Sequence, residues 1–194
     1  MEALKLKTLT DLLDTPEERV ELIDGDIVQR PMARMEHGFV QSNTVAELDT
    51  FRRTSGPGGW WIVTEISVNY SSHQCPTHDL AGWRKERLPE RPRGVVEIVP
   101  DWVCEIVSPG HERKDTLTIF LLLQRHQVPF YWLIWPEDRT LIAFQLDGQS
   151  YRVIASVTLS GTEERTMRIP PFDTLEIDVG YILGDSTASI PGAV

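Results

Sequence analysis

The stretch Asp101-Trp-Val-Cys-Glu-Ile-Val-Ser-Pro109 is the part of the sequence that says most about the fold. It is a nearly continuous apolar run that carries one glutamate, Glu105, and it ends at Ser-Pro. Such a run predicts a strand that is covered on both faces. A lone carboxylate in that setting is costly unless it is paired or bound to a metal. Glu105 is therefore a candidate site residue; a salt bridge to a neighbouring arginine, or a place at a solvent-facing strand end, is the alternative.

Three helices are predicted around this strand. A capping box at Thr8-Leu-Thr-Asp11 predicts a short helix near the start of the sequence. Apolar residues at three- and four-residue steps predict an amphipathic helix over residues 34–53. A very apolar segment over residues 116–125 predicts a buried helix, with Asp115 as its expected N-cap.

The remaining segments are mostly strands. The turn Asp24-Gly25 predicts a hairpin over residues 20–28. Further strands are expected over residues 60–70, 78–83, 130–135, 140–146 and 151–158. This order of elements predicts an α/β protein, in which a sheet is flanked by a few helices. A length of 194 residues suits one domain, expected over residues 1–183, and the small, polar segment 184–194 is expected to be a flexible tail.

Composition limits the classes of function. The chain carries 19 lysines and arginines against 29 acidic residues, which gives a net charge of −10. This balance argues against a broad basic surface that coats nucleic acid or anionic lipid, although it leaves room for a local metal site. Two cysteines, Cys75 and Cys104, are too few for a disulfide framework or a Cys-rich zinc site, so a reduced cytoplasmic protein is expected. No apolar run is long enough to predict a transmembrane helix.

A second acid, Asp79, opens the predicted strand Asp79-Leu-Ala-Gly-Trp83. Two carboxylates on adjacent strands can jointly hold a hard cation such as Mg²⁺, and an Asx-type turn at the strand start is the structural alternative. Asp101 is a poorer partner for Glu105, because four strand residues span about 13 Å at roughly 3.3 Å each. A zinc site made by His73, Cys75, His78 and Asp79 is a weaker hypothesis, since no second ligand pair has the usual spacing.

Several motifs together resemble the Uma-type "putative restriction endonuclease" family, formerly classed as a domain of unknown function, within the PD-(D/E)XK nuclease superfamily. The resemblance covers roughly residues 8 to 183 and rests on segments 18–28, 79–87, 100–109, 128–133 and 171–178, and on His37. It implies a restriction-endonuclease-like mixed central sheet flanked by helices, with an N-terminal helix and hairpin and a C-terminal β extension.

Position by position, the resemblance makes Asp79 the superfamily aspartate and Glu105 the glutamate of its E-x-K element. It implies that both bind Mg²⁺ or Mn²⁺, helped by the Ile106 carbonyl. The strand position of the lysine is Val107 here. In the family, this lysine comes from the following helix, four residues after an aspartate that corresponds to Asp115, and that position is Ile119.

Because the family lysine is absent, another side chain would have to supply the positive charge. Lys114 is the candidate replacement, and the alternative is that Lys114 and Arg113 are solvated loop charges. Three further residues that match the pattern or lie nearby could line the site: Glu21, His37 and Glu65. For each of these three, a plain surface position is the alternative.

The resemblance implies a Mg²⁺-dependent, DNA-cleaving endonuclease-like protein. The alternative is a catalytically decayed nuclease fold that serves as a nucleic-acid-binding or dimeric interaction module, which Ile119 and the net acidity both favour. A third hypothesis, a metal-dependent hydrolase of a smaller phosphate ester, suits an acidic surface better than long DNA does. DNA is the expected partner, and aromatic strands suggest a homodimer.

Overall fold

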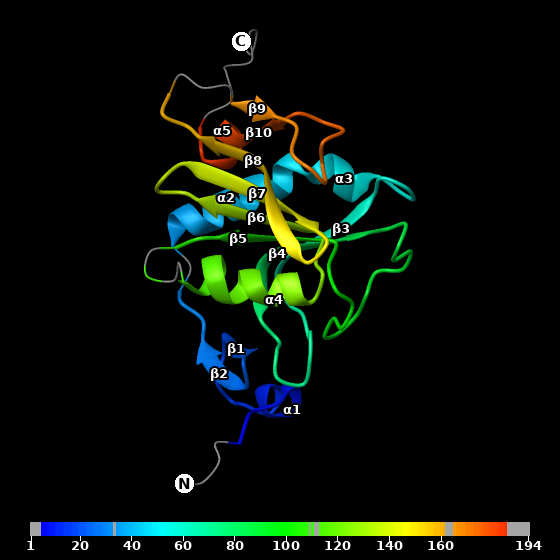
Figure 1. The fold of residues 1–194 in the computed structure, drawn as a ribbon, viewed down its shortest axis with the longest axis vertical. Coiled ribbons are helices and arrows are strands. Elements are labelled where there is room, and N and C mark those ends of the chain that lie inside the picture. Colours follow the sequence, from blue (N-terminus) through cyan, green and yellow to red (C-terminus); the bar gives the residue numbers. More distant parts are fainter. Residues whose placement is uncertain (1–4, 33, 109, 111–112, 162–164, 186–194) are drawn as a thin grey trace, which may run out of the picture.

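The computed structural model describes residues 5–32, 34–108, 110, 113–161 and 165–185. Its centre is a six-stranded sheet with the strand order β3-β4-β5-β6-β7-β8, shown in Figure 1. The strands are β3 (Trp60–Ser67), β4 (Thr77–Arg84), β5 (Trp102–Ile106), β6 (Phe130–Trp135), β7 (Thr140–Asp147) and β8 (Ser150–Thr158). Only β5 and β6 run parallel to each other; the other neighbouring pairs are antiparallel. The predicted mixed sheet flanked by helices is confirmed.

Helices cover both faces of the sheet (Figure 1). On one face, α2 (Met35–Glu47), α3 (Asp49–Arg53) and α5 (Val179–Ile182) contribute residues to a core that also contains Trp102 and Trp132. On the other face, the π-helical segment η1 (Lys114–Ile119) and α4 (Phe120–Arg125) pack on a core that contains Trp83 and Val103. Among the described residues, no helix is long and apolar enough to cross a membrane.

Strand β5 lies between these two cores, and this explains its unbroken apolar sequence. Trp102, Cys104 and Ile106 belong to the first core, whereas Val103 belongs to the second. Side chains alternate between the faces of a strand, so Glu105 points to the same side as Val103. The strand is buried at every position, which confirms the prediction of a strand covered on both faces.

The N-terminal helix and hairpin form as predicted. Helix α1 (Leu9–Leu13) begins at a capping box formed by Thr8 and Asp11, and β1 (Val20–Ile23) pairs with β2 (Asp26–Gln29). Leu22 and Cys75 exchange two backbone hydrogen bonds of 3.1 and 2.8 Å. This contact attaches the hairpin to the chain just before β4, and it brings the neighbouring Glu21 toward the sheet.

Three local predictions are wrong. The helix expected over residues 34–53 is two helices, because the chain turns at Leu48, whose side chain is fully buried in the first core. The strand expected over residues 60–70 ends at Ser67. Asp115 is not an N-cap, because the helix begins earlier and Asp115 lies inside η1 as a buried residue.

The C-terminal β extension is small. It consists of two-residue strands, β9 (Thr166–Met167) and β10 (Ile177–Asp178), which pair antiparallel to each other. Helix α5 follows, capped by the Asp178 side chain, and the sequence patterns did not predict it. The expected tail, residues 184–194, lies outside the described residues from position 186 onward.

Candidate active site

The two acids that the sequence singled out lie where β4 and β5 separate. The antiparallel ladder between these strands ends at the pair Leu80 and Cys104. At the next position, each acidic side chain accepts a hydrogen bond from the backbone of the opposite strand. The N–H of Ile106 donates to Asp79 Oδ2 at 2.8 Å, and the N–H of Asp79 donates to Glu105 Oε2 at 3.2 Å. Both acids are buried, and the Asx-turn alternative for Asp79 is wrong, because Asp79 lies within β4.

The second oxygen of Glu105 meets a histidine that the sequence suggested only as a zinc ligand. His78 Nδ1 lies 2.6 Å from Glu105 Oε1, and His78 Nε2 lies 2.9 Å from the Tyr70 hydroxyl. Burial, together with the positive charge of Lys114, lowers the pKa of His78 to about 3, so the imidazole is neutral at pH 7. A histidine directly beside Asp79 in a predicted strand was the signal available in the sequence for this contact.

The second oxygen of Asp79 faces a histidine and an arginine. His37 Nε2 lies 3.4 Å and Arg30 Nη2 lies 3.6 Å from Asp79 Oδ1. The other Arg30 nitrogen, Nη1, pairs with Glu65 Oε2 at 2.5 Å. His37 thus contacts Asp79 directly, whereas Glu65, whose side chain is 42% exposed, contacts Arg30. The sequence gave no signal for Arg30, which reaches the site from just beyond β2.

The same neighbourhood contains a candidate metal-ligand set. Ligand atoms of His37, Glu65 and Asp79 all lie within 4.8 Å of one another, and no other such group of three is found among the residues that the structure describes. The zinc hypothesis is therefore not supported in the described part of the chain. Gln41 Nε2 donates to Glu65 Oε1 at 3.0 Å and to the Asp79 carbonyl at 2.9 Å, which ties α2 to the site.

Lys114 reaches the site from η1 through a buried ion pair. Its Nζ lies 2.7 Å from Glu21 Oε1, and Glu21 Oε2 accepts the N–H of Thr77 at 3.1 Å. Glu21 is only 1% exposed, and the Lys114 side chain is 24% exposed. Lys114 is therefore partly covered, whereas Arg113 is exposed, as the alternative expected. Ile119, in contrast, is fully buried in the core beneath η1 and α4.

The charges of the site act strongly on one another. Burial works against the charged forms of Asp79 and His37, but their mutual contact outweighs it, so the pKa of Asp79 is lowered and that of His37 is raised. Burial and the charge of Asp79 hold the pKa of Glu105 well above its usual range. For Lys114, burial opposes the charge, yet the carboxylates of Glu21 and Glu105 outweigh it and raise its pKa.

The oxygens of Asp79, Glu105 and Ile106 have the chemistry to bind a hard divalent cation. Carboxylate and carbonyl oxygens are the preferred ligands of Mg²⁺ and Mn²⁺. Each carboxylate oxygen has two lone pairs, so the oxygens of Asp79 and Glu105 that accept a hydrogen bond keep acceptor capacity. One pocket is lined by these two acids together with Ile106, Lys114, His37, Glu65, Arg30 and Asp115. Burial is the main cause of the raised pKa of Glu105, and the negative charge of Asp79 adds to it.

The fold resembles that of a solved protein. A solved protein from Anabaena variabilis, described as a putative nuclease of the DUF820 group, superposes with a TM-score of 0.71 and 23% sequence identity. The match covers 91% of this chain and 97% of that one, so the chain has the fold of that protein. No curated protein matches the chain.

The family follows from the sequence itself. Residues 5–179 match the model of the family Uma2, described as "Putative restriction endonuclease". The chain belongs to this family, which confirms the resemblance drawn from its motifs.

Proposed function

We propose that this protein is a DNA endonuclease that uses Mg²⁺ or Mn²⁺ to hydrolyse phosphodiester bonds. The observation that carries the proposal is the pairing of Asp79 and Glu105 at the separation of β4 and β5, in one pocket with Lys114. Membership of a family described as restriction endonucleases supports a nucleic-acid substrate.

Each residue of the site has a role in this proposal. Asp79, Glu105 and the Ile106 carbonyl hold the cation. When bound, a divalent cation polarises the phosphate and lowers the pKa of water. Lys114 stays protonated because its pKa is raised, and it stabilises the charge that develops on the phosphoryl oxygens. Glu21 orients the Lys114 ammonium through their 2.7 Å contact.

The remaining polar residues favour the ionised form of Asp79. His37 and Arg30 face Asp79 Oδ1, and their contacts favour the ionised carboxylate that a cation needs. Glu65 and Gln41 hold this group together from β3 and α2. Glu65 has a positive φ of 50°, a backbone conformation that a non-glycine residue adopts at a cost of about 1–3 kcal/mol.

A decayed nuclease fold is the competing proposal, and a specific observation favours it. Ile119, at the position where the family places lysine, is fully buried in an apolar core and supplies no cation. Lys114 favours activity instead, because its ammonium already lies at the site. A decayed protein would still bind DNA or pair with a second copy, but it would not cleave.

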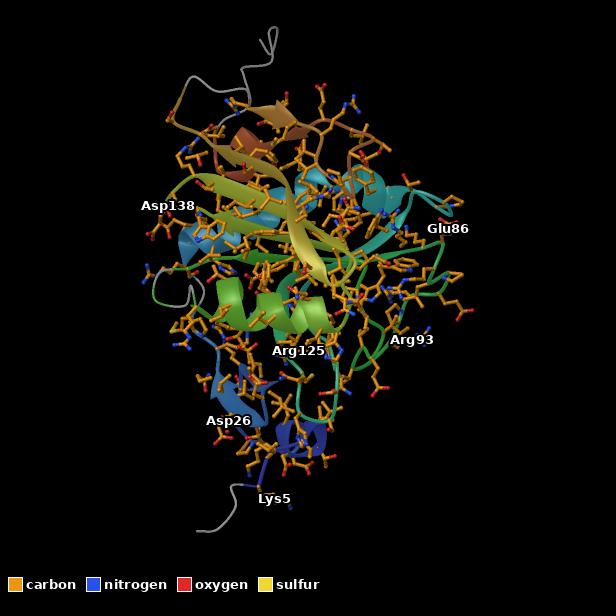
Figure 2. The ribbon with its side chains drawn as sticks, in the orientation of Figure 1. Lys5, Asp26, Glu86, Arg93, Arg125 and Asp138 are labelled. Carbon is orange, nitrogen blue, oxygen red and sulfur yellow. The ribbon has the colours of Figure 1, made fainter. Side chains whose placement is uncertain are left out.

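Cleavage of supercoiled plasmid in the presence of Mg²⁺ or Mn²⁺ tests the proposal. Asp79→Asn and Glu105→Gln should each lower the rate by at least about 10²-fold, because each replaces a charged ligand of the cation with a neutral amide. Asp26→Asn and Glu86→Gln are matched controls on exposed side chains at the periphery of the molecule (Figure 2), and they should cleave like the parent.

The possible results separate the hypotheses. Cleavage that survives both active-site substitutions contradicts the site assignment. A parent protein that binds DNA but never cleaves it supports the decayed fold. Hydrolysis of a small phosphodiester such as bis(p-nitrophenyl) phosphate, with intact plasmid, supports the hydrolase of smaller esters.

A further inference from the structure

Glu105 is held by a hydrogen-bond chain that the proposed function does not use. His78 Nδ1 lies 2.6 Å from Glu105 Oε1, and His78 Nε2 lies 2.9 Å from the hydroxyl of Tyr70. His78 is fully buried and Glu105 is 2% exposed. Water therefore cannot easily replace His78 as the hydrogen-bond partner of Glu105. The two hydrogen bonds of His78 thus help to fix the orientation of the Glu105 carboxylate.

We propose that His78 and Tyr70 are positioning residues, which hold the Glu105 carboxylate in the orientation that binds the divalent cation. The inference rests on the proposed function, because it concerns one of the proposed metal ligands. Partners behind a metal ligand orient it and commonly change metal affinity by 10–100-fold when they are removed.

Only one arrangement of hydrogens suits a metal-binding Glu105. An ionised carboxylate accepts hydrogen bonds and donates none. His78 must then donate from Nδ1, so its Nε2 carries no hydrogen and accepts one from the Tyr70 hydroxyl. Tyr70 thereby favours the tautomer of His78 that carries its hydrogen on Nδ1, although Tyr70 itself does not contact Glu105.

Tyr70 is itself fixed by packing. Its ring meets the His78 ring edge-on at 5.7 Å between centroids, and it lies 5.0 Å from the ring of His126, which caps the end of α4. The Tyr70 N–H donates to the Gln74 carbonyl at 2.8 Å. The chain of contacts thus links the segment between β3 and β4 to the candidate active site.

Each carboxylate oxygen of Glu105 therefore accepts one hydrogen bond from the protein. The Asp79 N–H occupies one lone pair of Oε2, and His78 occupies one lone pair of Oε1. The remaining lone pair on each oxygen is left for the cation. Loss of the His78 donor frees the carboxylate to rotate, which should weaken cation binding.

Calorimetric titration of the full-length protein with Mn²⁺ tests this role independently of cleavage. His78→Leu removes the donor and should weaken Mn²⁺ binding about 10–100-fold. His78→Asn places an amide N–H near the position of Nδ1 and should stay within about threefold of the parent. Tyr70→Phe removes one hydroxyl and should weaken binding by an intermediate factor. His73→Leu, a histidine bonded to the Lys7 carbonyl, is the matched control and should bind like the parent.

Unchanged affinity in His78→Leu would overturn the inference, and so would an Asn variant as weak as the Leu variant when both melt cooperatively. If His78→Leu does not fold, the Mn²⁺ affinity of Tyr70→Phe is the deciding measurement. An affinity equal to that of the parent would then contradict the proposal.

In the Mg²⁺-saturated protein, imidazole ¹⁵N shifts should place the hydrogen of His78 on Nδ1; a hydrogen on Nε2 contradicts the inference. A parent protein that binds no Mn²⁺ contradicts the proposed function itself, whereas parent binding that is lost in Asp79→Asn but kept in His78→Leu overturns the positioning role alone.

Discussion

At the scale of single residues, the site is a set of buried charges that depend on one another. Lys114 and Glu21 form an ion pair in which Glu21 is almost completely buried. Removal of one partner of such a pair leaves an uncompensated charge, whereas removal of both is often close to neutral for stability. This difference allows the structural role of Lys114 to be separated from its proposed catalytic role.

Lys114→Met should destabilise the protein by about 3 kcal/mol, because it leaves Glu21 unpaired. The double variant Glu21→Gln/Lys114→Met should recover most of the lost Tm, yet its cleavage rate should remain about 10²–10³-fold below that of the parent. Thermal melting and plasmid cleavage measure the two effects, with the exposed Lys5→Met as control (Figure 2). Parent-like cleavage by the double variant would show that Lys114 serves the fold only.

Glu105 gives a prediction about pH. Burial and the charge of Asp79 raise its folded-state pKa well above its usual range, so the folded state binds this proton more tightly than the unfolded state does. Its contribution to stability is therefore present below the unfolded pKa and is lost as the pH rises through the folded pKa. In the absence of metal, Glu105→Gln should raise the Tm at pH 8 by a few degrees and change it little at pH 4. An equal change at both pH values would contradict this account.

At the scale of secondary-structure elements, the separation of β4 from β5 creates the site. Backbone pairing ends at Leu80 and Cys104, and the side chains of Asp79 and Glu105 take over the freed backbone N–H groups. The hairpin that carries Glu21 and the segment η1 that carries Lys114 then supply the surrounding charges. The two strands, η1 and Arg30, which directly follows the hairpin, all line one pocket, although they are far apart in the sequence.

The packing of η1 also predicts the effect of a lysine at position 119, where the proposed correspondence with the family would place one. Ile119 is fully buried with Leu122 and Leu123 in an apolar core, so Ile119→Lys should lower the Tm by several degrees, because a buried unpaired charge is costly. In the Lys114→Met background, Ile119→Lys should not restore cleavage. Recovery of cleavage there would show that position 119 still reaches the site and that the family arrangement is accessible to this chain.

At the scale of the whole molecule, the net charge of −10 opposes DNA binding. A divalent cation held at Asp79 and Glu105 would offset charge where the phosphate must approach. We therefore expect Ca²⁺, as a cation of similar ligand preference, to raise the affinity for a short DNA duplex at least about tenfold. Fluorescence anisotropy at fixed ionic strength measures this, and Asp79→Asn should remove the Ca²⁺ effect. Equal affinity with and without Ca²⁺ would contradict the proposal.

The acids of the site were predictable because burial of a charge leaves a mark in the sequence. Glu105 interrupts an apolar run, and Asp79 lies near the start of a second buried strand. The partners of these acids leave no such mark. Arg30 looks like any surface arginine near a hairpin, and only the attachment of that hairpin through Leu22 and Cys75 brings this segment to the sheet.

The sequence by itself determined the α/β class, the positions of most strands and the family, and it pointed to the two acids of the candidate site. These properties follow from local patterns of apolar residues, turns and motifs. The tertiary structure decided which charges meet: Lys114 with Glu21, Arg30 with Glu65 and Asp79, and His78 with Glu105. It also decided that Ile119 belongs to a core. The physical reason is that ion pairs and hydrogen bonds act over a few ångströms in space, and proximity between distant segments depends on how the elements pack.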